Sequence, residues 1–387
     1  MKRLLFLGAA LFAAAVASPA QASAEPVYTV TVVAGAGSVA SDLNNLGQVV
    51  GRLDSGGGTY HGFLYDGSTL ADLGTLAGGS STATGINDSG VVVGNSWTDF
   101  SYQAFTYAGG ALTPLALPGN NVAEGINNAG VIVGTAQFLD GDGFYAPRAV
   151  IYDHGVVTNL GLLPGNGEGS SAIAINSAGK VVGTGDVEGP PNRPADPFLY
   201  ADGVMQNLGN FGGIYGVAWS INDHDQIVGS TGAEYIPGSG NLYPYRAFLY
   251  DASGLHDLGT LIEDGNSSAF DINNLGQIVG SAQTSGGFLA TLYVDGAVKL
   301  LNSLIDPASG WSIVESTAIN DLGQIAGTGC KDGLCYAVRL DLASAIPEPA
   351  HALMLLAGMG LVAGLRRSIG RRVDQPCREA LAAAFRT

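Results

Sequence analysis

Positive charge is scarce in this chain. Of its 387 residues, 16 are Lys or Arg and 33 are Asp or Glu, which gives a formal net charge of −17. Eight of the 16 basic residues lie in the two terminal segments, so the body of the chain has eight basic residues against about 30 acidic ones. Such a surface repels phosphate backbones, and we therefore expect no nucleic-acid partner.

Histidine is also rare, and the common catalytic motifs are missing. The five histidines are scattered along the chain, and the sequence contains no H-E-x-x-H, G-x-S-x-G or Walker lysine motif. We therefore predict a non-enzymatic protein with no catalytic residue. One alternative stays open, because a repeat protein can assemble a polysaccharide hydrolase or lyase site from acids on separate repeats.

Cysteine is limited to three residues, two of which stand close together. Cys330 and Cys335 flank the turn sequence Lys-Asp-Gly-Leu, a spacing compatible with a disulfide across a hairpin. A metal site is the alternative, but no third or fourth Cys or His ligand lies nearby. We predict the disulfide, which fits an oxidising compartment. Cys377 lies beyond the C-terminal arginines and has no such neighbour.

Long hydrophobic runs occur only at the two ends. Residues 1–24 contain Lys2 and Arg3, an apolar run from Leu4 to Val16, and Ala-x-Ala cleavage patterns. This arrangement predicts a secretory signal peptide. The run of about 13 residues is shorter than the roughly 20 that a membrane span needs. We therefore expect the chain to be exported.

The C-terminal segment 346–373 has three parts in a fixed order. Ile346 is followed by Pro-Glu-Pro, then by an apolar stretch from Ala352 to Leu365, then by an arginine cluster. A short apolar helix backed by arginines is expected to halt in the inner membrane. The residues of the three-part signal are Pro347, Glu348, Pro349, Arg366, Arg367, Arg371 and Arg372.

This three-part end resembles the PEP-CTERM sorting signal of Gram-negative bacteria. The resemblance implies recognition by an exosortase and processing near Pro347–Pro349. It also implies transient residence in the inner membrane and delivery to the cell surface or the exopolysaccharide matrix. A short tail, residues 374–387, departs from the pattern, because such chains usually stop soon after the arginines.

The body, residues 25–345, is one unit repeated seven times. The motif I-N-x-x-G-x-V-V-G recurs at spacings of 40 to 51 residues, close to the roughly 40 to 50 of a four-stranded propeller blade. Its asparagines are Asn44, Asn87, Asn127, Asn176, Asn222, Asn273 and Asn320. Each unit divides into four short strands, with the Asn-x-x-Gly turn between the first and the second.

The two ends of the repeat array complement each other. Tyr28–Val33 reads as a fourth strand with no third strand before it, and the seventh unit stops after its third strand near Leu342. Pairing these segments closes the array and removes exposed edges. We therefore predict an all-β, seven-bladed β-propeller closed by its N-terminal strand. Helices are expected only in the signal peptide and the C-terminal transmembrane sorting segment.

The segments HGFLYDG, DLGTLAGG and GINDSGVVVG resemble the HAF-repeat family of extracellular bacterial proteins. The resemblance covers about residues 28–342 and implies secretion and a repeat architecture, but no established activity. The fifth copy departs from the pattern, because Asp225 stands where the turn glycine is expected.

Loop lengths indicate which rim of the propeller contacts a ligand. The connections between the second and third strands vary in length and hold aromatic residues, whereas the turns on the opposite rim, between the first and second and between the third and fourth strands, are short. We hypothesise that this rim binds exopolysaccharide, since aromatic faces pack on sugar rings. The alternative is that these side chains only hold the loops in place. The candidate residues are Trp97, Phe100, Tyr102, Phe144, Tyr145, Tyr235, Tyr243 and Tyr245.

Calcium is the one cofactor for which the sequence offers ligands. Asp140-Gly-Asp142-Gly contains two carboxylates but lacks the third acidic position and the terminal Glu of an EF-hand loop. A solvated acidic turn is the alternative. A structural protein that uses its acidic surface as a matrix component, bridged by Ca²⁺, also remains open.

Overall fold

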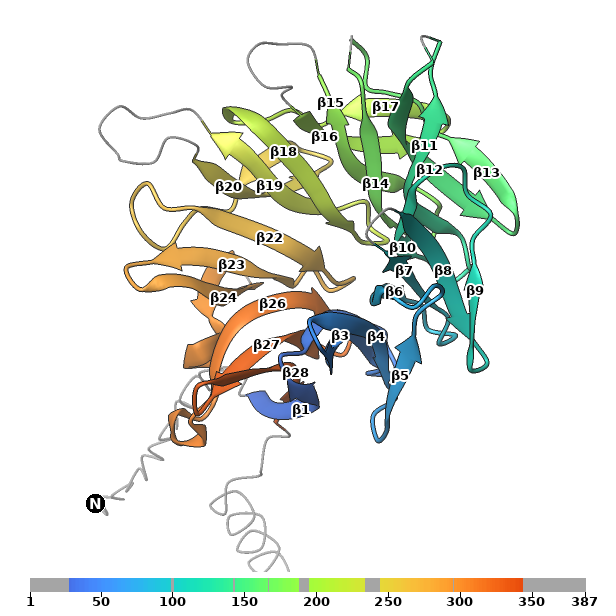
Figure 1. Ribbon diagram of the computed structural model, residues 1–387. Helices are drawn as coiled ribbons and strands as arrows, with labels where there is room; N and C mark the ends of the chain where they lie inside the picture. Colours follow the sequence, from blue (N-terminus) through green and yellow to red (C-terminus); the bar gives the residue numbers. More distant parts are fainter. Residues whose placement is uncertain are drawn as a thin grey trace, which may run out of the picture. The chain divides into compact units, whose positions relative to one another are not determined.

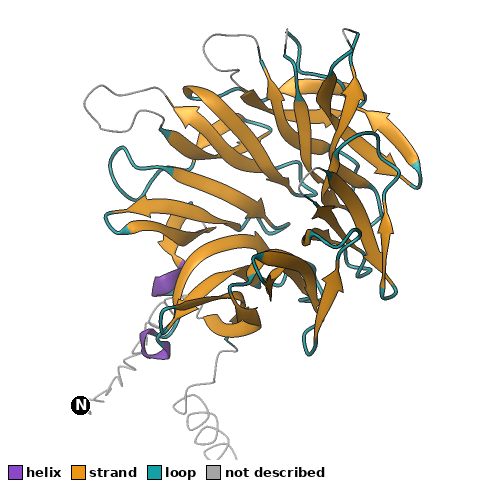
Figure 2. Cartoon of the chain, viewed as in Figure 1, coloured by secondary structure: helices purple, strands orange, loops and turns teal. Residues whose placement is uncertain are grey.

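The computed structural model describes residues 28–98, 101–141, 143–165, 167–187, 195–233, 244–294 and 296–343. Within them the chain forms 28 β-strands and two short 3₁₀ helices, η1 (Leu301–Ser303) and η2 (Pro307–Ser309). All of these elements belong to the first of two compact units, Met1–Leu342 and Ala343–Thr387. Figure 2 shows how completely strands dominate it, which confirms the predicted all-β class. The predicted signal peptide, sorting segment and tail lie outside the described residues.

The strands follow the repeats of the sequence. Their bounds are β1 (Tyr28–Ala36), β2 (Val39–Leu43), β3 (Val49–Gly56), β4 (Thr59–Tyr65), β5 (Leu70–Gly74), β6 (Ser80–Ile86), β7 (Val92–Trp97), β8 (Tyr102–Ala108), β9 (Ala111–Pro114), β10 (Asn121–Ile126), β11 (Ile132–Leu139), β12 (Tyr145–Asp153), β13 (Val156–Asn159), β14 (Ser170–Ile175), β15 (Val181–Asp186), β16 (Ala195–Ala201), β17 (Val204–Asn207), β18 (Gly212–Ile221), β19 (Ile227–Ala233), β20 (Tyr245–Asp251), β21 (Gly254–Asp257), β22 (Ser267–Ile272), β23 (Ile278–Thr284), β24 (Gly287–Val294), β25 (Ala297–Leu300), β26 (Ser312–Ile319), β27 (Ile325–Lys331) and β28 (Leu334–Leu342).

Successive strands pair into antiparallel sheets that are arranged around a common centre (Figure 1). Five sheets have four strands each: β2–β5, β6–β9, β10–β13, β22–β25 and the sheet β1-β28-β27-β26. The strands β14 to β21 form one eight-stranded sheet, in which a single parallel bridge between Ala195 and Tyr215 joins β16 to β18.

The structure differs from the predicted elements in two respects. Helices were expected only at the two chain ends, but the short 3₁₀ helices η1 and η2 follow β25, which ends at Leu300. Several rim aromatic residues also belong to strands and not to loops, because β7, β8, β12 and β20 reach further than the sequence indicated.

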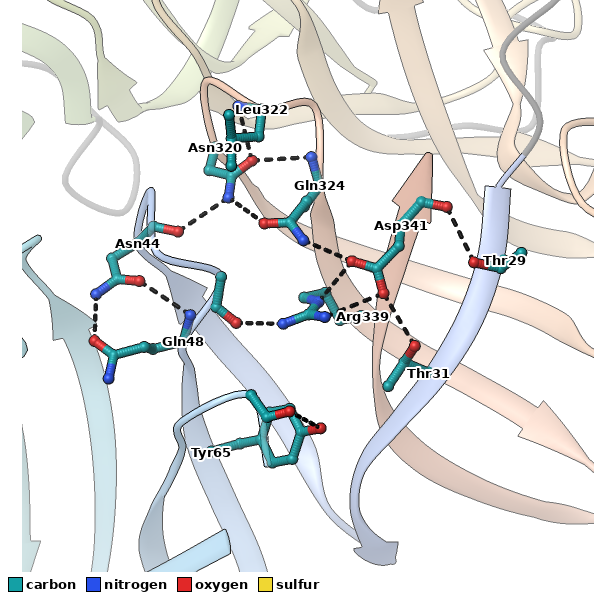
Figure 3. A network of polar contacts seen from close by, with 12 residues as sticks. Thr29, Thr31, Asn44, Gln48, Tyr65, Asn320, Leu322, Gln324, Arg339 and Asp341 are labelled. Carbon is teal, nitrogen blue, oxygen red and sulfur yellow. Dashed lines mark hydrogen bonds and ion pairs between the residues drawn. The ribbon is translucent and has the colours of Figure 1, made fainter. Parts of the chain in front are cut away.

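The N-terminal strand closes the last sheet, as its position in the repeat predicted. Strand β1 pairs antiparallel with β28, with Tyr28 opposite Leu342 and Val32 opposite Val338. We call this junction of β1 with β28 the seam. Asp341 stabilises it, because its carboxylate accepts hydrogen bonds from Thr31 Oγ1 at 3.0 Å and Gln324 Nε2 at 2.6 Å, and from the guanidinium of Arg339. Arg339 in turn donates to the Gly47 carbonyl of the first repeat (Figure 3). This network links β1 and β28 to the first repeat.

The motif asparagine shapes the turn between the first two strands of each repeat. In the first copy, Asn44 Oδ1 accepts from the backbone N–H groups of Leu46 at 3.1 Å and Gln48 at 3.0 Å. Gly47 has a φ of 73°, a left-handed conformation that glycine adopts at little steric cost. In the fifth copy Asp225 takes the same conformation, with a φ of 61°, and its carboxylate pairs with Lys180 at 2.6 Å.

The last glycine of the motif is required because two strands approach closely at this point. A Cβ at Gly94 would lie 2.2 Å from the Thr82 carbonyl oxygen and 2.7 Å from the ring of Phe105. Phe105 stands opposite Gly94 across the strand pair and is fully buried. The corresponding phenylalanines Phe63, Phe198 and Phe248 also face the motif glycine of their repeats. These third-strand phenylalanines therefore pack in the core over the motif glycines.

Candidate functional site

A ring of buried asparagines surrounds one end of the central channel. Each motif asparagine donates its Nδ2 hydrogen to the backbone carbonyl of the motif asparagine in the next repeat, at 2.9 to 3.2 Å. The last of these bonds runs from Asn320 to Asn44 and returns to the first repeat. Because Oδ1 serves the local turn while Nδ2 serves the neighbour, aspartate cannot replace asparagine here.

The residues directly after these asparagines line the same opening. They are Asn45, Asp88, Asn128, Ser177, Asp223, Asn274 and Asp321, and they border a pocket of about 220 Å³. Several are joined between repeats: the backbone N–H of Asn45 donates to Asp88, and that of Asp321 donates to Asn45. Because these side chains already form hydrogen bonds with one another, they hold this end of the channel together as a ring of polar residues.

A β-bulge in the first strand of every repeat directs side chains into the channel. The register shifts at the residue three positions before each motif asparagine, for example between Ala123 and Gly125. Bulges of this kind re-aim side chains and are common beside functional sites. The seven bulge residues are Ser41, Thr84, Glu124, Ile173, Trp219, Phe270 and Thr317. All seven line a recess of about 310 Å³ within the channel.

Two buried aspartates lie beside the bulges. Asp42 accepts from the backbone N–H groups of Leu43 at 2.8 Å and Ile86 at 2.9 Å. Asp271 accepts from Ile319 N at 2.7 Å, Ile272 N and the Ser220 hydroxyl. Loss of water, and then the charge of Asp271, raises the pKa of Asp42 to about 7. Burial likewise raises the pKa of Asp271. Both carboxylates thus join the first strands of different repeats.

Glu124 differs from these aspartates because no described residue forms a hydrogen bond or an ion pair with its carboxylate. It stands at the bulge of β10 and faces the recess. Burial alone raises its pKa from 4.5 to about 7. The carboxylate is therefore partly buried without a partner among the described residues, and it is available to a ligand.

An aromatic pair completes the lining of the recess. Trp219 and Phe270 come from the bulges of β18 and β22, and their rings meet edge to face with centroids 6.2 Å apart. Trp219 is 37% exposed, although it lies inside the channel. The recess thus combines an accessible indole with three carboxylates from separate repeats.

The rim residues predicted from the sequence are dispersed. Trp97 stacks on Tyr102 with centroids 6.3 Å apart at the end of the β7–β8 hairpin. Tyr245 stacks on Phe288 of the next sheet at 6.4 Å, and burial raises its pKa. Phe144 and Tyr145 are exposed at the β11–β12 turn. The remaining candidates, Phe100, Tyr235 and Tyr243, lie outside the described residues. The rim candidates that the structure describes therefore form separate small groups and not one site.

The predicted calcium loop and disulfide have different surroundings. Asp140 accepts a hydrogen bond from the backbone N–H of Phe144 at 2.8 Å and so closes its own turn, while Asp142 is not described. Among the described residues no three His, Cys, Asp or Glu side chains are grouped to hold a metal ion. Cys330 and Cys335 form a disulfide between β27 and β28.

The sorting residues Pro347 to Arg372 lie beyond the described residues. In the part of the chain that the structure describes, no helix is long and apolar enough to cross a membrane.

The channel site was missed from the sequence, although a signal was present. The position three residues before the motif asparagine varies among Ser, Thr, Glu, Ile, Trp and Phe. The residue before it is Ala in six copies and Ser in the seventh. Variation at one position of a constant frame indicates side chains that do not serve the fold.

Comparisons with solved structures identify the fold. The β-propeller domain of the Trilobed protease from Pyrococcus furiosus matches with a TM-score of 0.51 and 11% identity, over 79% of this chain and 96% of that one. The acylaminoacyl peptidase of Pyrococcus horikoshii gives 0.49 and 14% identity, over 79% and 52%. TolB from Acinetobacter baumannii gives 0.41 and 14% identity, over 64% and 61%. The first match confirms the predicted β-propeller architecture, and at these identities only the fold is shared.

Sequence comparisons add a family without an assigned activity. A family described as "Protein of unknown function (DUF3466)" matches residues 119–338. No match to a curated protein sequence was found.

Proposed function

Because this chain belongs to the DUF3466 family, whose description states no function, we propose a role from its own channel: it is a non-enzymatic, saccharide-binding β-propeller. The observation that carries the proposal is the convergence of Trp219, Phe270 and three carboxylates in one recess of about 310 Å³. This volume is at the lower end of the roughly 300 to 1,000 Å³ of ligand pockets. It suits a sugar unit or a chain end.

The chemistry of the recess matches a hydroxyl-rich ring. The C–H faces of a sugar pack against aromatic rings, and carboxylates accept hydrogen bonds from its hydroxyls. Trp219 offers an accessible face, and Glu124 has two unbonded oxygens. The described rim aromatic residues provide less, because they lie in separate small groups and do not share one recess with carboxylates. The channel is therefore the favoured site, and the rim is a comparison site.

Cleavage of the bound saccharide, by a hydrolase or a lyase reaction, is a second candidate function. It is favoured by the convergence of Asp42, Glu124 and Asp271 from three repeats, each with a raised pKa. Glycoside hydrolysis needs two carboxyl groups free to act on the bond. Asp42 and Asp271 each use both oxygens on backbone N–H groups, which leaves Glu124 alone. Binding is therefore the better supported function.

The proposed location follows from the two chain ends. The signal-peptide pattern supports export, and the PEP-CTERM-like segment supports processing by an exosortase after transient residence in the inner membrane. The final location would be the cell surface or the exopolysaccharide matrix. Mass spectrometry of the mature chain tests this, because cleavage near Pro347–Pro349 is expected and an intact C-terminus contradicts it.

We also propose that the propeller has seven blades. The eight-stranded sheet contains two sets of four strands, β14–β17 and β18–β21, joined only by one bridge. The asparagine ring supports counting them as two blades, because one asparagine belongs to each set.

Binding of the purified chain to exopolysaccharide from the producing organism tests the proposed function. We expect Trp219→Ala to weaken binding at least about tenfold, which corresponds to about 1.4 kcal/mol. Trp97→Ala is the matched control on the rim and should leave binding unchanged. The opposite pattern places the site on the rim and overturns the channel assignment. Thermal melts of both variants establish that each is folded.

A further inference from the structure

No cationic side chain among the described residues pairs with the carboxylates of the recess. The residues that line it include Asp42, Glu124 and Asp271 but no Lys, Arg or His. In the described part of the chain no ion pair reaches any of the three carboxylates. The two aspartates accept hydrogen bonds from neutral backbone groups, which satisfy their oxygens without cancelling their charge.

A neutral sugar would leave this charge uncompensated. Burying an ionised carboxylate without an opposite charge is costly, and Glu124 lacks even a hydrogen-bond donor. A ligand that brings a positive charge removes this cost, whereas a uronic acid would increase it. The recess therefore selects for positive charge.

The spacing of the acids argues against a metal ion as the source of that charge. No three described carboxylate or imidazole groups are grouped tightly enough to hold one. The aromatic pair points instead to an organic cation, because an ammonium group is attracted to the face of a Trp within about 6 Å of the ring centroid. Trp219 offers such a face beside Phe270.

We propose that the recess recognises an amino sugar with a free, protonated amine, with Trp219 packing on the sugar ring and Glu124 pairing with the ammonium group. This inference rests on the proposed saccharide-binding function and names the ligand class for it. Burial raises the pKa of Glu124 to about 7, so the carboxyl must lose its proton to pair with the ammonium group, which costs little at neutral pH and above. Acetylation of the amine removes both the charge and the pairing.

Calorimetric titration of the full chain at neutral pH and low salt tests the pairing. The ligands are glucosamine oligomers, N-acetylglucosamine oligomers and glucose oligomers of equal length, with 1,4-diaminobutane as a sugar-free amine. We expect the free amine to bind at least tenfold more tightly than its acetylated form, with this preference weakened by salt. Glu124→Gln should abolish the preference, whereas Trp219→Ala should weaken binding of all three oligomers.

The ligand series distinguishes failure of this inference from failure of the proposed function. Equal binding of acetylated and free oligomers, or an unchanged preference in Glu124→Gln, overturns the amine inference and leaves saccharide binding intact. Binding of 1,4-diaminobutane without any oligomer overturns the saccharide function. Binding of none of the ligands overturns both. Glu263→Gln, at an exposed turn, is the matched control for the loss of one acidic group and should keep the preference.

Discussion

Replacing Glu124 with Gln should stabilise the unliganded protein in a way that depends on pH. The carboxylate lies in the channel wall and accepts no hydrogen bond from any described residue, so Gln loses no interaction there and removes a partly buried negative charge. Burial raises the pKa of Glu124 from 4.5 to about 7 in the folded state. At about 1.4 kcal/mol per pH unit, this difference corresponds to about 3 kcal/mol of unfolding free energy.

The direction of the effect follows from proton linkage. Below a pH of about 4.5 the group is protonated in both the folded and the unfolded chain, so Glu and Gln should give equal stability. Between 4.5 and 7 the folded state binds more protons than the unfolded state, and the native protein loses stability as the pH rises. The advantage of Glu124→Gln should therefore grow from near zero to about 3 kcal/mol above a pH of about 7.

Urea denaturation of both proteins across this pH range measures the difference. Glu263→Gln serves as the control, because this exposed turn residue changes the net charge equally. A stability difference between Glu124→Gln and the native protein that stays flat from acidic to alkaline pH would refute the reasoning. It would mean that water from the channel keeps Glu124 fully hydrated.

Three further predictions concern the contacts that hold the propeller together. Asn320→Asp places a carboxylate against the Asn44 carbonyl, so the unfolding free energy should fall by about 1 to 3 kcal/mol, and an unchanged urea midpoint contradicts this. Gly94→Ala puts a Cβ 2.2 Å from a carbonyl oxygen of β6 and should cost about 3 kcal/mol or more, so recovery of a native-like melting temperature rules the clash out. Asp341→Ala removes the acceptor at the seam, and hydrogen exchange should accelerate in β1 but not in β14; equal acceleration in both strands disproves a local seam.

The strand order could be predicted from the sequence because the same succession of strands and turns recurs in every repeat. Each Asn-x-x-Gly turn fixes one strand pair, and the unmatched strand at Tyr28 has only one available partner at the end of the seventh copy. The propeller architecture and the terminal pairing therefore follow from spacing alone. The disulfide between Cys330 and Cys335 follows from the same local geometry.

The candidate site could not be predicted by the same reasoning. Simple alternation along a strand assigns each side chain to one of two faces, but a bulge adds one residue and changes the assignment. Glu124 and Trp219 reach the channel only because β10 and β18 bulge at these residues. Exposed aromatic residues at hairpin ends gave a stronger signal in the sequence, and the structure disperses them. Motif variation among the copies is the feature that would have identified the channel.

The closed circuit of asparagine side chains also limits how this protein can evolve. An open solenoid can gain or lose a unit at its end, and each unit still contacts its neighbours as before. Here the motif asparagine of every repeat donates one hydrogen bond to the next repeat, and the last of these bonds runs back to the first repeat. Duplicating or deleting a single repeat would change the diameter of the asparagine ring and misalign all of its hydrogen bonds between repeats at once. Variation is therefore directed into the side chains that face inward, where the residue can change while the number of units stays fixed.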